Sequence, residues 1–230
     1  MTPPLSRSFF ARAPELVAAE LLGCTLVVQL VDGTVALRIT ETEAYGGVGD
    51  DAASHAYRGC RARSATMFGP PGRLYVYFTY GMHFCANVVA HRDTDRDADA
   101  VAGAVLLRAA EVTDGLHVVW RRREGAALLA ERDLARGPAR LTVAAGLNRT
   151  HDGLDLCAAS LSEPKVPDVQ FCTPTASLPS SAVRCGHRVG ISREVERPWR
   201  FWIADDATVS GSRPRNGGAG APSTAQQSPT

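Results

Sequence analysis

Two carboxylates and a tyrosine follow an apolar run in the segment VALRITETEAY, residues 35–45. If this segment is a β-strand, alternation with a period of two places six side chains on one face: Val35, Leu37, Ile39, Glu41, Glu43 and Tyr45. A carboxylate at the end of an apolar face is partly desolvated, which raises its pKa and suits a general base that activates water. Both carboxylates could instead lie at the surface, or one could pair with an arginine, and we expect at least one to be structural.

A tyrosine-rich segment, LYVYFTYGMHFCANVV (residues 74–89), reads as two strands joined by a turn at the Gly-Met step. A period of two puts Tyr75 and Tyr77 on one face and leaves Tyr80 at the exposed tip. An aromatic ring at a tip suits insertion between stacked bases, and aromatic rings in a pocket suit stacking on flat ligands. The alternative is an ordinary hairpin with an aromatic-rich core.

Two polar side chains interrupt the apolar strands that follow. Asn87 shares a face with His83 and Cys85, and Arg108 ends the apolar run AVLL. Buried polar groups need partners, so Asn87 either reads the edge of a base or ties down a turn. Arg108 is placed to reach the carboxylates or a phosphate.

Hydrophobic patterning and turn residues predict the elements that position these groups. The expected helices and strands alternate along the chain, with helices at residues 14–23, 115–131 and 137–146 and strands at 24–31, 34–44, 74–80, 83–90, 104–109 and 195–203. Residues 46–73 read as a long ordered loop, a kind of segment that usually carries function. Residues 91–100 read as a charged loop, and 151–187 as mostly irregular with short strands.

The length and composition indicate one soluble globular domain. We expect this domain at residues 1–210, followed at 211–230 by a disordered tail of Gly, Ala, Pro, Ser, Thr and Gln. No apolar run reaches the roughly 20 residues that a bilayer span needs, and the N-terminus lacks the features of a signal peptide. We therefore expect a cytoplasmic protein without a membrane contact.

Charge and cysteine content narrow the choice of cofactor and partner only slightly. The formal net charge of +1 argues for no particular partner. Lys165 is the only lysine, and a cationic charge made of arginine suits bidentate phosphate contacts or reflects genome composition. The six cysteines form no CxxC pair and are expected to be free thiols. Two His–Cys pairs, His83 with Cys85 and Cys185 with His187, lack the ligand spacing of a zinc site. No metal is expected.

Beyond these separate features, the chain resembles the alkyladenine (3-methyladenine) DNA glycosylase family, the mammalian-type enzymes that also occur in bacteria. The similarity covers residues 8–210 and lies in separate motifs that agree with the family in order and spacing. These motifs are ETEAYGG, SHAYRG, MFGPPG with LYVYFTYGM, ANVV, AVLLRA, RGPARL and RPWRFWI. The chain departs from the family pattern after SHAYRG, where it has RGCRARS in place of RGRTPRN with Arg63 retained, and at His83, where a phenol ring is usual. The first departure puts the phosphate contacts of that loop in doubt.

The resemblance implies a base excision repair enzyme that flips a damaged purine out of duplex DNA and hydrolyses its N-glycosidic bond, leaving an abasic site. Its substrates would be alkylated or deaminated purines of the 3-methyladenine, hypoxanthine and ethenoadenine type. No amine is placed to form a Schiff base, so a monofunctional enzyme is expected, with no cofactor, as a monomer associated with the bacterial nucleoid. The implied fold is a single mixed α/β (α+β) domain around a curved antiparallel β-sheet with flanking helices and a protruding β-hairpin.

The resemblance also implies catalytic roles for matching residues. Glu43 is similar to the general base that orients and deprotonates the attacking water, and Glu41 to a supporting residue. Arg108 resembles an arginine that helps to hold the water and a 3′ phosphate. Tyr45 and Tyr77 resemble the walls that stack on the flipped base.

Recognition of the base and of DNA is implied for five further residues. His55 would contact the base edge or the sugar and phosphate, and Asn87 would exclude guanine by crowding its exocyclic amine. Tyr80 resembles the residue inserted through the minor groove into the vacated place in the stack. Arg63 and Met82 would contact DNA beside it.

Two other classes of function remain open at this point. A nucleic-acid binding module without catalysis would keep the tyrosines and arginines but would not need Glu43. A hydrolase of small nucleosides would need neither Tyr80 at the hairpin tip nor phosphate-contacting arginines.

Overall fold

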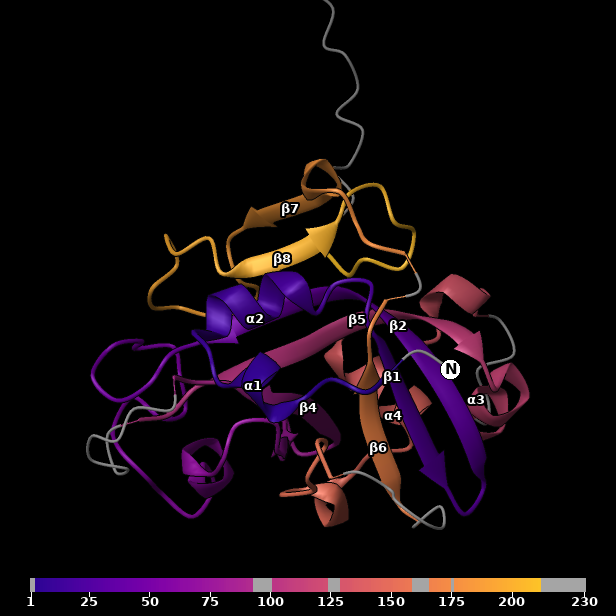
Figure 1. Cartoon of the computed structure of the whole chain (residues 1–230), viewed down its shortest axis with the longest axis horizontal. Coiled ribbons are helices and arrows are strands. Elements are labelled where there is room, and N and C mark those ends of the chain that lie inside the picture. The colour runs from indigo at the N-terminus through magenta and orange to yellow at the C-terminus, as the bar shows by residue number, and fades with distance from the viewer. Residues whose placement is uncertain (1–2, 93–100, 124–128, 159–165, 175, 212–230) are drawn as a thin grey trace, which may run out of the picture.

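The computed structural model describes residues 3–92, 101–123, 129–158, 166–174 and 176–211 (Figure 1). Its helices are α1 (Arg7–Phe10), α2 (Pro14–Glu20), α3 (Leu116–Arg122) and α4 (Pro138–Ala145), and its strands are β1 (Thr25–Leu30), β2 (Gly33–Tyr45), β3 (Leu74–Thr79), β4 (His83–Val89), β5 (Ala104–Asp114), β6 (Asp168–Cys172), β7 (Val183–Gly186) and β8 (Arg200–Ile203). Short 3₁₀ turns lie at Ala65–Phe68, Glu131–Asp133, Arg149–His151 and Ser180–Ala182.

All the strands belong to one curled antiparallel sheet, which confirms the expected fold class. The order is β3-β4-β5-β2-β1-β6. The first half of β2 pairs with β1, whereas its last residues pair with β8, which carries β7 at its outer edge. The long strand β2 therefore joins two parts of the sheet, and the two carboxylates lie on the half that faces β8 (Figure 1).

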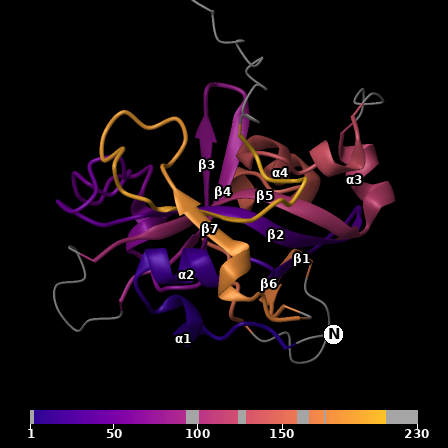
Figure 2. The ribbon, with the colours of Figure 1, turned by 90° about the horizontal axis from the view of Figure 1, so that it is seen from above.

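Apolar side chains from the sheet and the helices form one main core. Helix α2 packs on β2 and β5, and α4 packs on β4 and β5 (Figures 1 and 2). Both helices begin with proline at the first turn, and Gly146 ends α4 in the left-handed conformation with φ of 69°. Leu141 of α4 is fully buried, and burial of such a side chain contributes about 1.5–3 kcal/mol.

A β-bulge in β2 turns the carboxylates away from the face that was expected for them. Ile39 pairs with Ala110 of β5 whereas Glu41 pairs with Ala109, which leaves Thr40 as an extra residue. Neighbouring residues of a strand point to opposite faces, so one extra residue shifts the alternation and reverses the face of the residues that follow it. The prediction of one continuous face along this strand was therefore wrong, because its apolar half and its carboxylate half point to opposite sides of the sheet.

Several predicted boundaries were also wrong, and α2 ends at Glu20 rather than at residue 23. Helix α3 ends at Arg122 because the backbone of Arg123 leaves the helical conformation, with φ of −111° and ψ of 39°, and Glu131–Asp133 forms a separate 3₁₀ turn, so the helix does not run to residue 131. Strand β5 continues to Asp114 because it also pairs with the first half of β2. Strand β8 begins at Arg200 rather than at residue 195.

The hairpin of β3 and β4 stands out from the rest of the sheet (Figure 2). Its turn centres on Tyr80 and Gly81, which have φ of 49° and 68°, one residue earlier than expected. Two successive positive φ values are typical of a type I′ turn, and a tyrosine in this conformation is strained. Tyr80 is 84% exposed and Met82 is 70% exposed, so the tip presents apolar side chains to solvent, as predicted.

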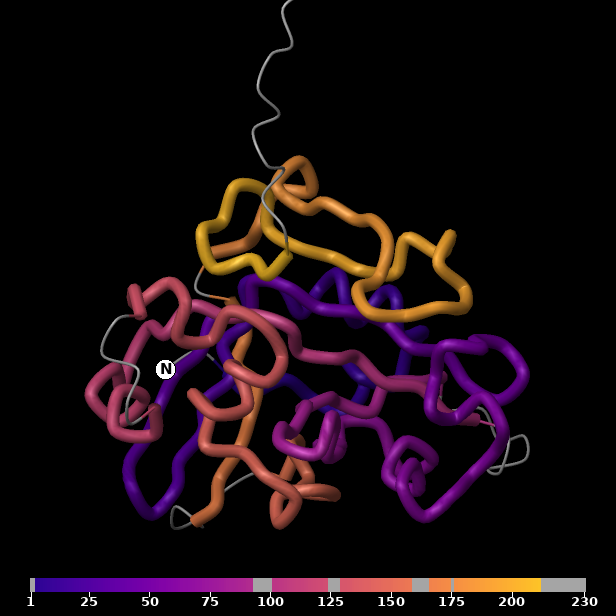
Figure 3. The backbone as a smooth tube through the Cα atoms, turned by 180° about the vertical axis from the view of Figure 1, so that it is seen from behind, coloured from indigo at the N-terminus to yellow at the C-terminus, as the bar shows by residue number. Residues whose placement is uncertain are grey.

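The loop from residue 46 to 73 lies beside the segment that precedes β8, although 137 residues separate Asp51 from Arg188 (Figure 3). No helix within the described ranges is long and apolar enough to cross a membrane. The predicted charged loop at 91–100 falls almost wholly outside the described residues, as does the predicted tail after Gly211.

Candidate active site

An open cavity of about 240 Å³ lies where β3, β4 and β5 meet two loops. Its lining brings together most of the side chains that the sequence singled out: Tyr45, His55, Arg63, Tyr77, Tyr80, Asn87 and Arg108. Glu43 has no exposed surface and lies behind this lining, and Met82 lies outside it. Aromatic walls with a few polar groups suit a flat ligand with polar edges.

One cross-strand row runs from Glu43, behind the cavity, through three residues that line it. Glu43 on β2 pairs with Leu106 on β5, which pairs with Asn87 on β4, which pairs with Tyr75 on β3. Register partners on neighbouring strands point to the same face. Antiparallel pairing thus aligns a carboxylate, an apolar side chain, an amide and a phenol on one face.

Glu43 is held by two hydrogen bonds and one ion pair, all from residues that line the cavity. Its Oε2 accepts a hydrogen bond from the hydroxyl of Tyr45 at 2.8 Å, and its Oε1 accepts one from the backbone N–H of Val189 at 2.7 Å. Arg108 Nη1 lies 3.2 Å from the same Oε1. Burial raises the pKa of Glu43, and Arg108 and the two hydrogen bonds oppose this rise without cancelling it.

Arg108 connects Glu43 to the second carboxylate. It is the extra residue of a bulge in β5, between the partners of Glu41 and Thr42, and its Nε donates to Glu41 Oε1 at 2.8 Å. Glu41 also accepts from Arg200 Nε at 2.7 Å and from the backbone N–H of Ser210 at 2.6 Å. With these partners Glu41 is suited to the supporting role that was expected, because it fixes the arginine beside Glu43.

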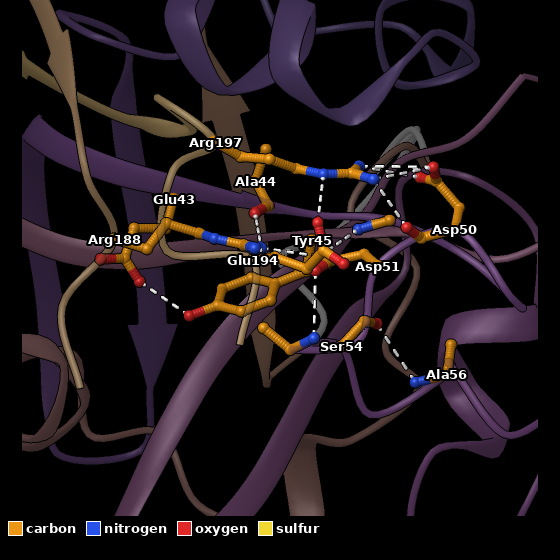
Figure 4. Close-up of polar contacts among 12 residues, drawn as sticks. Glu43, Ala44, Tyr45, Asp50, Asp51, Ser54, Ala56, Arg188, Glu194 and Arg197 are labelled. Atoms are coloured by element: carbon orange, nitrogen blue, oxygen red, sulfur yellow. Dashed lines mark hydrogen bonds and ion pairs between the residues drawn. The ribbon is translucent and has the colours of Figure 1, made fainter. Parts of the chain in front are cut away.

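A fully buried ion pair anchors the two loops that close the site (Figure 4). Arg188 donates to both carboxylate oxygens of Asp51, at 2.6 and 2.9 Å, and to the carbonyl of Ala44 at 2.9 Å. Its guanidinium lies 4.7 Å from the ring centre of Tyr45, within cation–π range. Arg188 immediately precedes Val189, so this pair positions the N–H that Glu43 accepts.

Tyr75, His55 and Arg63 form a hydrogen-bonded chain along one wall. The Tyr75 hydroxyl donates to the Arg63 carbonyl at 3.1 Å and lies 3.0 Å from His55 Nδ1. An arginine side chain only donates, so His55 Nε2 accepts from Arg63 Nη2 at 2.8 Å and the imidazole carries its proton on Nδ1. Burial and the charge of Arg63 lower the pKa of His55 to about 4, so the ring is neutral at pH 7.

Tyr77 and Asn87 complete the cavity on the hairpin side. The Tyr77 ring packs edge-on against His55 with centroids 4.6 Å apart. Asn87 is buried, and its Nδ2 donates to the carbonyl of Tyr75 at 3.0 Å. This bond fixes which way the amide faces while the side chain still lines the cavity. The expected shared face of Cys85 and Asn87 is confirmed, because both line it.

Several site residues escaped the sequence reasoning. Val189 acts through its backbone, Arg188 and Asp51 meet only through tertiary folding, and Ser210 reaches Glu41 from the end of the expected domain. Tyr75 was placed on the correct face but given no role. Within the ranges that the structure describes, no group of three His, Cys, Asp or Glu side chains could hold a metal ion.

The site is therefore a buried carboxylate with a raised pKa, paired with an arginine behind an aromatic cavity that suits a flat ligand. The chain belongs to the methylpurine-DNA glycosylase (MPG) family, whose model matches residues 8–207. The resemblance read from the sequence is thereby confirmed.

Relatives from three bacteria match nearly the whole chain. A Streptomyces avermitilis protein is 46% identical over 208 residues, covering 90% of this chain and 91% of the relative. A Leifsonia xyli subsp. xyli protein is 46% identical over 215 residues, with 91% and 92% covered, and a Nocardia farcinica protein is 45% identical over 213 residues, with 90% and 91% covered. Each is named "Putative 3-methyladenine DNA glycosylase".

Proposed function

We propose that this protein excises alkylated and deaminated purines from duplex DNA as a monofunctional, monomeric DNA glycosylase of base excision repair. The observation that carries this proposal is Glu43, a fully buried carboxylate held by Tyr45, Arg108 and Val189 directly behind an aromatic cavity. The family and the names of the relatives support the coarser assignment, a DNA glycosylase for alkylated bases. We further propose that it works in the cytoplasm, where a bacterial chromosome would be its substrate.

Base recognition requires extrusion of the nucleotide, because the glycosidic bond of a purine lies inside the duplex. Tyr45 and Tyr77 line the cavity and would stack on the extruded ring. An alkylated purine is electron-poor and is attracted to electron-rich rings in the manner of a cation–π contact. Tyr80, on the exposed hairpin tip, would fill the space that the base leaves in the stack.

Hydrolysis would use Glu43 as the general base. Departure of the purine with the electrons of the C–N bond leaves an oxocarbenium-like sugar. Glu43 would take a proton from water as the water oxygen bonds to the anomeric carbon, and its negative charge would stabilise the transition state. Its raised pKa makes it a stronger base than an exposed glutamate, while Arg108 favours the ionised form.

The absence of an amine from the cavity lining supports a monofunctional reaction. A lyase step needs an amine that forms a Schiff base, and the described residues that line the cavity include no lysine. Lys165 falls outside the described residues. Water is then the only nucleophile that the proposal uses, and the product is an intact strand with an abasic site.

The decisive experiment uses end-labelled duplexes that carry one hypoxanthine or one ethenoadenine. Incubation should release the free base and give strand breaks only after alkali treatment, both with and without excess EDTA. Strand breaks before alkali treatment would contradict the monofunctional mechanism, and loss of activity restored by zinc or magnesium would contradict the metal-free one. Tight binding of damaged duplex without release of base would favour a non-catalytic binding module, and action on free nucleosides alone a nucleoside hydrolase.

A further inference from the structure

Ser210 is a buried residue behind the cavity that contacts Glu41 and both arginine partners of Glu41. Its backbone N–H donates to Glu41 Oε2 at 2.6 Å, and its hydroxyl accepts from Arg108 Nη2 at 3.2 Å. Its carbonyl accepts from Arg200 Nη2. All three polar groups of this one residue therefore bind members of the carboxylate network, although Ser210 does not line the cavity.

The segment between β8 and Ser210 is fixed on β2 by contacts of its own. Arg38 Nη2 donates to Asp206 Oδ2 at 2.7 Å, and the hydroxyl of Thr208 is hydrogen-bonded to that of Thr40 at 2.8 Å. Thr40 is the extra residue of the bulge in β2. The segment is thus attached at the point where the strand turns its carboxylates, and this attachment brings Ser210 to them.

The three nitrogens of the Arg108 guanidinium face three different residues. Nε donates to Glu41 Oε1 at 2.8 Å, Nη1 lies 3.2 Å from Glu43 Oε1, and Nη2 donates to the hydroxyl of Ser210. A guanidinium is a rigid plane, so three separate partners fix both its position and its tilt. The two carboxylates attract the same cation, and the hydroxyl determines where the cation lies between them.

We propose that Ser210 is a positioning residue for base excision, which holds Arg108 at the distance from Glu43 that keeps this carboxylate ready to accept a proton. The inference rests on the proposed function, because it takes Glu43 to be the general base. Burial raises the pKa of Glu43, and the charge of Arg108 opposes this rise. An arginine that is held less firmly would oppose it less.

The first test measures the pKa of Glu43 directly. Carbon-13 NMR of labelled glutamate carboxyl groups follows the titration, and Glu43→Gln identifies the signal. Ser210→Ala removes the hydroxyl but keeps the backbone contacts to Glu41 and Arg200, so the fold should persist while the pKa of Glu43 rises. Ser210→Thr keeps the hydroxyl and should keep the parent pKa.

The second test is the pH dependence of single-turnover excision from a hypoxanthine duplex. In Ser210→Ala the acidic limb should move to higher pH together with the pKa of Glu43. The rate at pH 7 should fall about tenfold, the effect of one hydrogen bond to a charged group. Because Ser210 does not line the cavity, the dissociation constant for a duplex with a tetrahydrofuran abasic analogue should equal that of the parent.

Thr42→Val is the matched control for the loss of a buried hydroxyl. Thr42 lies between the two carboxylates in sequence, but its side chain points to the opposite face of β2. There its hydroxyl donates to the carbonyl of Ala18 in α2 at 2.8 Å, and valine has nearly the same shape as threonine. This variant should lose stability in chemical denaturation but keep the parent pKa of Glu43 and the parent acidic limb.

Three results would overturn the inference. A pKa of Glu43 in Ser210→Ala equal to that of the parent would show that the hydroxyl does not hold Arg108 in place. An equal rise in Ser210→Thr would show that the hydroxyl is not the group that matters. An equal rise in Thr42→Val would reduce the effect to general loss of stability. The titration does not depend on catalysis, so a parent that excises no base would refute the proposed function while the titration still decides whether Ser210 positions Arg108.

Discussion

Glu43 and Asn87 are both register partners of Leu106, one from each side of β5. Since neighbouring strands lie about 4.8 Å apart, the two residues are about 10 Å apart across the sheet and on the same face. Backbone hydrogen bonds therefore set the spacing between the proposed general base and the proposed selector of the base. Among the residues that the structure describes they share no hydrogen-bond partner, so their effects should be separable.

Replacement of Glu43 by Gln should lower single-turnover excision by at least about 100-fold, the usual scale for loss of a general base. Binding of damaged duplex should persist, because the amide keeps the shape of the carboxylate. In the parent, excision should fall on the acidic side at a pH above the ordinary pKa of glutamate, since burial raises the pKa of Glu43 and only the ionised form accepts a proton. Near-normal excision by Glu43→Gln would contradict its role as the general base and would make Glu41 the candidate.

Replacement of Asn87 by Ala should relax selectivity against guanine. The amide, held by the carbonyl of Tyr75, would collide with the exocyclic amine of guanine but not with hypoxanthine, which lacks it. Removal of a clash lowers selectivity without any new attractive contact. The measurement is the ratio of guanine to hypoxanthine excision from mismatched duplexes. A ratio equal to that of the parent would refute the exclusion of guanine by Asn87 and would indicate a purely structural role for this amide.

Replacement of Tyr80 by Ala should weaken binding of damaged duplex and slow excision, with smaller effects on loosely stacked mismatches. Unstacking a base costs a few kcal/mol per step and less when the base is already poorly held. The comparison uses duplexes that differ only in the opposing base. Because the Tyr80 side chain is exposed, its loss should not destabilise the fold. Equal losses on all substrates would indicate that it is not a wedge.

Replacement of Arg188 by Met should destabilise the protein by about 3–5 kcal/mol, the usual cost of leaving one buried charge of a pair without its partner. Each single variant, Arg188→Met or Asp51→Leu, leaves one buried charge without its partner. The double variant leaves no buried charge and should therefore be less destabilised than either single variant. Chemical denaturation measures all three. A double variant that equals the sum of the singles would show that the two side chains do not act as a pair.

His55 should make stability pH-dependent between its unfolded and folded pKa values, near 6.5 and about 4. In this range the unfolded chain binds the proton and the folded one does not, so the free energy of unfolding should fall as pH decreases. The stability that neutral His55 confers is complete above pH 6.5. The measurement compares unfolding at pH 7 and pH 5 in the parent and in His55→Gln. If the parent loses no more stability than the variant, the lowered pKa of His55 would be contradicted.

The hairpin shows how much of the site local patterning determines. Alternation along residues 74–89 placed Tyr75 and Tyr77 on the face that lines the cavity and Tyr80 at the exposed tip, and the structure agrees. The same reasoning placed Glu41, Glu43 and Tyr45 together. These relationships depend only on the period of a strand, which every residue of the segment shares, and so the amino-acid sequence by itself specifies them.

Tertiary structure alone decided where the carboxylates point and what holds them. The bulge at Thr40 reverses the face of β2, and the bulge at Arg108 of β5 directs the guanidinium to Glu41. Both depend on the pairing between two strands that are far apart in the chain. Val189 donates to Glu43 across 146 positions of sequence. A backbone N–H is present at every residue except proline, so no pattern of side chains marks the one that the fold brings to the carboxylate.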